Sequence, residues 1–75
     1  MEIADFVIHI HAELSATERT KLELEVSKRD GVISAHFSHD HPHLLTIAYN
    51  PDAISSDALL KQVNDQGLEA TKVGL

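Results

Sequence analysis

The sequence predicts one α+β domain with the element order βαββαβ. Four short segments carry apolar and β-branched residues in the manner of half-buried strands. Two longer segments between them begin at serine and are followed by glycine, which are boundary signals of helices. The chain has 75 residues and contains no linker, low-complexity tract or internal repeat, so residues 1–75 are expected to fold as a single domain.

Residues 5–11 are expected to form the first strand. From Phe6 to Ile10 every second residue is apolar and would face the core. His9 and His11 would then lie on the opposite, half-exposed face of the same strand.

The first helix is expected to begin after Ser15 and to run to about Asp30. Ser15 and Glu18 have the spacing of a capping box, in which each side chain accepts a hydrogen bond from the backbone of the other residue. Gly31 is placed to end the helix. The apolar stripe of this helix is thin and consists mainly of Leu22 and Val26.

Residues 32–38 and 44–49 are expected to form the second and third strands. The alternation of the second strand is imperfect at Ile33. The segment between the strands, residues 39–43, is polar and contains Pro42, so it should form a hairpin loop. The inward-facing residues of the third strand would be Leu45, Ile47 and Tyr49.

The second helix is expected to be capped by Ser55 or Ser56 and closed by Gly67. Residues 68–73 would form the last strand. Two split βαβ units with right-handed crossovers give an antiparallel sheet of order 4-1-3-2, with both helices on one face. This is the ferredoxin-like arrangement.

The alternation also suggests a register for the first and third strands. Pairing His11 with Leu44 and His9 with Thr46 keeps the apolar residues of both strands on the buried face. His36 would oppose Thr46 from the other side, so His9 and His36 would flank Thr46 on the helix-free face of the sheet. The first loop and the hairpin would share one edge of the domain.

Composition excludes several classes of protein. The absence of cysteine excludes a disulfide scaffold, a zinc ribbon, an iron–sulfur protein and a thiol nucleophile. The net charge of −6 argues against a nucleic-acid-binding surface. No segment has the roughly 20 apolar residues of a membrane span. The acidic N-terminus lacks the positive region of a signal peptide, so we expect the cytoplasm.

The sequence does not suggest an enzyme. With three glycines the chain has no glycine-rich phosphate loop, and no Ser-His-Asp constellation is indicated. Other proteins of this fold class bind phosphate through an arginine beside the first strand or stack RNA bases on aromatic residues of the open sheet face. Arg19 and Arg29 both fall in the first helix, and the third strand would present Leu44, Thr46 and Ala48 on that face.

Three segments carry a pattern that spans nearly the whole chain. Gly31 and Val32 open a strand after the first helix, residues 45–51 (LTIAYNP) form a strand that ends in a turn, and residues 59–68 (LLKQVNDQGL) form a helix that ends at glycine. At this spacing they resemble the heavy-metal-associated domain family of small copper chaperones and P-type ATPase N-terminal modules. The resemblance implies the same ferredoxin-like fold.

The sequence departs from this family at its metal-binding positions. Members bind Cu(I) or similar ions through Cys-x-x-Cys at the end of the first strand. Counting back from Gly31, those positions are occupied by Ser15 and Glu18. A hydroxyl and a carboxylate do not hold Cu(I) as two thiolates do, so the Cu(I) chemistry of the family is not expected here.

Histidine is the unusual residue of this chain, with six copies, all within the first 43 residues. Imidazole suits divalent ions such as Zn, Ni or Cu(II). The candidate ligands at the shared edge of the domain are His11, His39, His41 and His43. Asp40 is a fourth candidate ligand within the loop that holds His39, His41 and His43, and the secondary candidates on the sheet face are His9 and His36. The alternative interpretation is a solvated polar hairpin beside a half-exposed strand.

Two functions therefore remain open. The first is a small soluble protein that handles a divalent metal ion through histidine in place of cysteine. The second is a metal-free module that binds a protein partner or a second copy of itself through the open sheet face, which would present Val7, Leu44 and Ala48.

Overall fold

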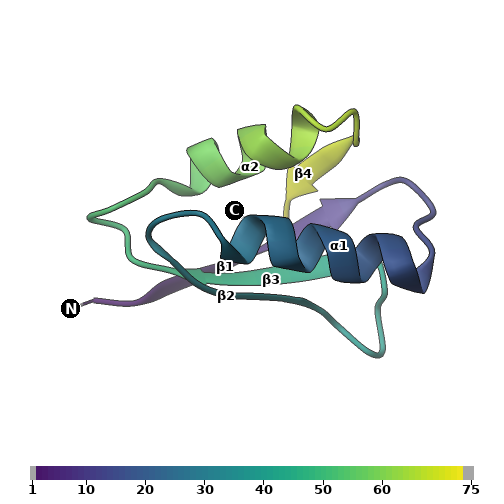
Figure 1. Ribbon diagram of the computed structural model, residues 1–75, viewed down its shortest axis with the longest axis horizontal. Coiled ribbons are helices and arrows are strands. Elements are labelled where there is room, and N and C mark those ends of the chain that lie inside the picture. The colour runs from purple at the N-terminus through teal and green to yellow at the C-terminus, as the bar shows by residue number, and fades with distance from the viewer. Residues whose placement is uncertain (1, 74–75) are drawn as a thin grey trace.

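The computed structural model describes residues 2–73 and has the predicted element order. Both helices cover the same face of a four-stranded antiparallel sheet (Figure 1). The strands lie in the order β2-β3-β1-β4, as predicted. The elements are β1 (Ala4–Ile10), α1 (Ala16–Ser27), β2 (Val32–Phe37), β3 (Leu44–Tyr49), α2 (Ser56–Asn64) and β4 (Ala70–Lys72).

The core lies between the sheet and the two helices. The predicted alternation is confirmed, because Ile8 and Ile10 of β1 and Leu45 and Ile47 of β3 are fully buried, whereas the residues between them are half-exposed. Phe6 and Tyr49 pack edge to face, with ring centroids 5.5 Å apart. The fully or almost fully buried side chains are Ile8, Ile10, Leu22, Val26, Leu45, Ile47, Leu59 and Val63.

The register of β1 against β3 differs from the prediction by two residues. His9 lies opposite Leu44 and Val7 lies opposite Thr46. A shift of two leaves every side chain on the same face, so the hydrophobic pattern alone does not distinguish the two registers. His36 does oppose Thr46, as predicted, so the neighbours that flank Thr46 are Val7 and His36 and not His9.

Helix α1 ends three residues earlier than predicted. It ends at Ser27, and Lys28 forms the C-cap. Gly31 instead lies in the turn that leads into β2, with φ of +94°. A Cβ atom at Gly31 would lie 2.9 Å from side-chain carbons of both Ala53 and Ile54, so this turn requires glycine for its backbone conformation and for the close approach.

The other boundaries are close to the predicted ones. Ser55 caps α2, which ends at Asn64, and Gly67 follows with φ of +84°. A β-bulge between Val32 and Ser34 explains the imperfect alternation at Ile33, which is 47% exposed. Strand β4 is shorter than predicted and comprises three residues.

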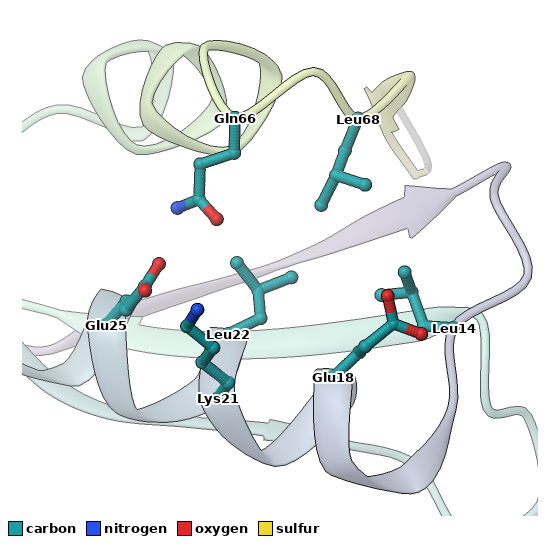
Figure 2. Close-up of a pocket in the computed structure, with 7 residues that line it drawn as sticks. All are labelled: Leu14, Glu18, Lys21, Leu22, Glu25, Gln66 and Leu68. Atoms are coloured by element: carbon teal, nitrogen blue, oxygen red, sulfur yellow. The ribbon is translucent and has the colours of Figure 1, made fainter.

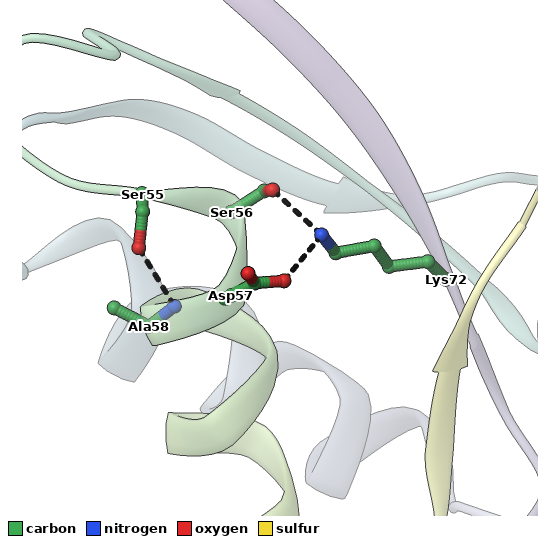
Figure 3. Close-up of polar contacts among 5 residues, drawn as sticks. All are labelled: Ser55, Ser56, Asp57, Ala58 and Lys72. Carbon is green, nitrogen blue, oxygen red and sulfur yellow. Dashed lines mark hydrogen bonds and ion pairs between the residues drawn. The ribbon is translucent and has the colours of Figure 1, made fainter. Parts of the chain in front are cut away.

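Lys72 links the short edge strand β4 to the start of α2. The Nζ atom of Lys72 donates to Ser56 Oγ at 2.8 Å and contacts Asp57 Oδ1 at 2.5 Å (Figure 3). Beside this contact, the Oγ atom of Ser55 accepts the backbone N–H of Ala58 at 3.1 Å. The end of β4 is thereby tied to the first turn of α2.

Candidate metal site

Ser15 and Glu18, the two positions at which the resemblance would place the family's cysteines, form the predicted capping box. The Oγ atom of Ser15 accepts the backbone N–H of Glu18 at 3.1 Å, and Glu18 Oε1 accepts the backbone N–H of Ser15 at 2.9 Å. The hydrogen bond from the Ser15 backbone, followed by the one from the Ser15 side chain, lowers the pKa of Glu18 below 4.5. Both side chains therefore serve the first turn of α1, and neither offers a soft ligand for Cu(I).

A groove runs from this cap between α1 and the segment that joins α2 to β4. Gln66 and Leu68 point from that segment toward α1 (Figure 2). The groove has a volume of about 220 Å³ and is lined by Leu14, Glu18, Lys21, Leu22, Glu25, Gln66 and Leu68. Its floor is apolar and its donors are carboxylate, ammonium and amide, so it does not fit the thiolate chemistry that the resemblance implies.

Three histidines meet instead at the edge formed by the β1–α1 loop and the β2–β3 hairpin, which lie at the same end of the molecule (Figure 1). The rings of His9 and His11 pack edge to face with centroids 4.3 Å apart, and the rings of His9 and His43 have centroids 5.9 Å apart. The backbone N–H of Ile10 donates to the carbonyl of His43 at 2.9 Å and holds the two segments together.

The hydrogen bonds of His43 define how its ring is protonated. Nδ1 lies 2.9 Å from the carbonyl oxygen of Ile10, and because a carbonyl oxygen only accepts, Nδ1 must carry a proton. In the neutral ring Nε2 then carries a lone pair. That atom lies 3.4 Å from Glu13 Oε1. Two acceptors at this distance are stabilised by a cation between them or by a second proton on the ring.

The spacing of these atoms matches two donors on one tetrahedral metal ion. With metal–donor bonds of ~2.0–2.1 Å, two ligands of tetrahedral zinc lie about 3.3 Å apart, and two imidazole centroids on one zinc lie about 5 Å apart. The 3.4 Å between His43 Nε2 and Glu13 Oε1 fits the first value. The 5.9 Å between the His9 and His43 rings is within an ångström of the second. The bond from His43 Nδ1 to a backbone carbonyl is the outer-shell contact that commonly orients a ligand histidine.

The other candidate histidines lie in different places, and His11 has a further contact of its own. His41 joins His9 and His43 in lining a pocket of about 260 Å³ on the hairpin, together with Asp40. His11 contacts Thr71 Oγ1 through Nε2 at 3.2 Å. His39 lines a different pocket beside α1.

His36 is an exposed residue of β2, and strand β3 separates it from β1. The top-edge cluster is defined here as His9, His11, His43 and Glu13.

Within residues 2–73, no set of three or more histidine and carboxylate side chains has the complete arrangement of a metal site. The top-edge cluster thus contains one pair of donor atoms, His43 Nε2 and Glu13 Oε1, at the spacing of two ligands on one ion. The rings of His9 and His11 lie beside this pair. Glu13 was not among the residues nominated from sequence. It lies two residues beyond His11 in the loop and is 93% exposed, so nothing in its local pattern distinguishes it from the other acidic residues.

Comparison with known proteins supports the fold. No protein-family model and no curated protein matches the sequence. Oxidized MerP from Ralstonia metallidurans CH34 is 12% identical, with a TM-score of 0.83 over 97% of this chain and 100% of that one.

Two further solved structures relate the fold to metal-binding proteins. The N-terminal domain of a potential copper-translocating P-type ATPase from Bacillus subtilis, solved in the Cu(I)-loaded state, is 22% identical, with a TM-score of 0.84 over 97% of this chain and 90% of that one. The metallochaperone CsoZ is 17% identical, with a TM-score of 0.78 over 93% and 99% of the two chains.

These neighbours confirm the resemblance at the level of the fold; one of them is solved with Cu(I) bound and another is a metallochaperone. No helix within residues 2–73 is long and apolar enough to cross a membrane. The chain thus has the ferredoxin-like fold of heavy-metal-associated domains and contains no cysteine.

Proposed function

We propose that this protein handles a divalent transition metal ion, such as zinc, nickel or Cu(II), at the top-edge cluster. His43 Nε2 and Glu13 Oε1 would be the first pair of ligands, and His9 would join them by a small movement of its ring. His11 and His41 flank this pair. The metal would be cargo of the protein, as it is for the metallochaperone that shares its fold.

The observation that carries the proposal is the 3.4 Å separation of His43 Nε2 and Glu13 Oε1. The ring of His43 is already oriented by the Ile10 carbonyl, so the Nε2 lone pair needs no further ordering to meet an ion. His43 is also partly shielded, with 36% of its side chain exposed. An ion pair at an exposed carboxylate is weak by itself, whereas coordination to a metal adds a bond that solvent does not screen.

The donor set supports a divalent ion in preference to Cu(I). Imidazole and carboxylate are suitable ligands for zinc, nickel and Cu(II), and Cu(I) is selected by thiolate and thioether. The chain has no cysteine and one methionine. The metal would therefore differ in class from the Cu(I) carried by the ATPase domain that is similar in fold.

The proposal is tested by zinc competition against a chromophoric chelator at neutral pH. In the critical variant, His41→Ala is combined with His43→Ala. The matched control combines His36→Ala with His39→Ala, which removes the same number of imidazoles from other parts of the surface. A further variant, Glu13→Gln, removes the carboxylate charge.

We expect the first variant to bind zinc at least about tenfold more weakly than the parent, because each lost ligand or outer-shell group costs roughly 10–100-fold in affinity. The control should bind as the parent does, and Glu13→Gln should lie between. Equal binding by the parent and both double variants would contradict the proposal.

A further inference from the structure

The donor pair at the top edge leaves part of the coordination sphere of an ion open. A tetrahedral zinc ion takes four ligands, and His43 Nε2 and Glu13 Oε1 are the two atoms at ligand spacing. Within residues 2–73 no set of three or more histidine and carboxylate side chains is arranged as a complete site. An ion held by the pair alone keeps two positions open, and one position stays open when His9 joins. Zinc sites of this kind bind water or a substrate molecule at the open position.

The pocket on the hairpin shares two histidines with this cluster. Its volume is about 260 Å³, and its walls include His9 and His43 together with the apolar side chains of Pro42 and Leu44. At ~30 Å³ for each water molecule, this volume corresponds to roughly nine waters, which is enough space for a small organic molecule. Apolar walls with a few polar groups are typical of small-molecule sites. A molecule that binds the ion would therefore find space beside the two histidines.

The charges around this pocket determine which class of molecule it accepts. Within the described part of the chain, the residues that line the pocket include one carboxylate, Asp40, and no lysine or arginine. Glu13 adds a second carboxylate beside His43, and the whole chain carries a net charge of −6. A polycarboxylate such as citrate makes its zinc complex negative, so this edge would repel it. Zinc bound to one α-amino acid anion stays positive, so the edge would attract that complex.

We infer that the top-edge cluster binds the metal ion together with one α-amino acid, whose side chain occupies the hairpin pocket. This inference rests on the proposed function, because it needs the ion to bind at the cluster. The amine and the carboxylate of the amino acid fill the two open positions, and the amine releases its proton to solvent when its lone pair binds the ion. His9, which joins the pair when the amino acid is absent, then lines the pocket. The cargo is thus a chelate and not the bare ion.

The inference is tested on the full chain by equilibrium dialysis at neutral pH, with isotope-labelled L-histidine as the probe. One sample contains one equivalent of zinc and the reference contains a chelator instead. We expect the chain to retain one histidine molecule with zinc and none with the chelator. Zinc and histidine should each raise the affinity of the chain for the other by the same factor, typically about 5–150-fold for coupled ligands. Citrate, as a second probe, should remove zinc from the chain and should not be retained.

A variant that fills the pocket tests where the amino acid binds. Leu44→Trp places a larger side chain in the pocket and leaves His43 and Glu13 unchanged. Its matched control is Ala48→Trp, on the same strand and face but opposite Asp5 and away from the pocket. We expect Leu44→Trp to bind zinc and to lose the zinc-dependent gain in histidine affinity, at least about fivefold, whereas Ala48→Trp behaves as the parent does. Circular dichroism checks folding, and Leu44→Phe replaces Leu44→Trp if that variant unfolds.

The outcomes separate the two proposals. Zinc binding by the parent without retention of histidine would overturn the chelate and leave the proposed function intact. A failure of the parent to bind zinc at all would overturn both. Retention of histidine in the presence of chelator, or equal retention of citrate with zinc, would contradict a metal-dependent site that selects by charge. Equal histidine affinity of Leu44→Trp and the parent would show that the hairpin pocket does not hold the amino acid.

Discussion

Removal of the Ser15 hydroxyl tests whether the cap at the start of α1 serves stability or binding. Ser15→Ala deletes the acceptor for the Glu18 backbone N–H, now 3.1 Å away. Loss of a serine N-cap costs about 0.5–2 kcal/mol of unfolding free energy. For a domain of this size each kcal/mol lowers the Tm by about 4–8 °C. Helix α1 supplies Leu22 and Val26 to the core, so loss of the cap should lower the unfolding free energy of the whole domain.

The assay is urea unfolding followed by circular dichroism, with zinc affinity measured on the same samples. Ser55→Ala is the matched control, because Ser55 caps α2 through an equivalent bond to Ala58 N–H at 3.1 Å. We expect both variants to lose similar stability and to bind zinc as the parent does. A loss of zinc binding by Ser15→Ala at unchanged stability would refute the reasoning and would assign Ser15 a functional role.

The pH dependence of the cap has a definite sign. The pKa of Glu18 is lowered in the folded state, chiefly by the Ser15 backbone N–H, relative to an ordinary value of 4.5. The stabilisation from this carboxylate is therefore present above about pH 4.5 and is lost as the pH falls through the lowered value. The stability difference between the parent and Glu18→Gln should shrink in that acidic range. A difference that is constant from pH 6 to 3 would contradict the hydrogen bonding of the carboxylate.

Two further predictions concern metal choice and acid behaviour. The parent should lose Cu(I) to a thiol buffer in a competition assay. The double variant with Ser15→Cys and Glu18→Cys should retain Cu(I), because two thiolates would then lie at the start of α1. Retention of Cu(I) by the parent would contradict the assignment of Ser15 and Glu18 to the helix cap. The chain should lose solubility on acidification, because protonation of all six imidazoles takes the net charge from −6 to zero and removes the self-repulsion. Zinc affinity should fall as well, because protons compete with the metal for the imidazole nitrogens. Light scattering and the chelator assay from pH 8 to 5 check both, and constant solubility or constant affinity would contradict them.

The fold was predictable because several independent signals agree. The alternation from Phe6 to Ile10 identified β1 and its buried face, and the box formed by Ser15 and Glu18 located the start of α1. The order of strands followed from handedness rules once the elements were placed. The end of α1 was wrong by three residues, because Gly31 is needed for the turn against Ala53 and was taken as a helix terminator.

The site was only partly predictable because it depends on register and on loop conformation. The sequence predicted that His11, His39, His41 and His43 share one edge. The structure brings His9 together with His11 and His43, and His41 lines a pocket with His9 and His43, whereas His39 lines a different pocket. The predicted register paired His9 with Thr46, whereas in the structure His9 lies opposite Leu44. Because side chains in a strand alternate with a period of two, the hydrophobic pattern does not reveal an error of two residues. Glu13 became visible as a ligand candidate only when the folded loop placed it beside His43.

The central claim is tested most directly by NMR of the imidazole nitrogens during a zinc titration. Nδ1 of His43 should keep its proton, because it donates to the Ile10 carbonyl, and Nε2 should change to the shift of a metal-bound nitrogen. His9 should respond with it, while the nitrogens of His36 and His39 stay unchanged. Equal responses from all histidines, or a response confined to His39, would contradict a metal site at the top-edge cluster.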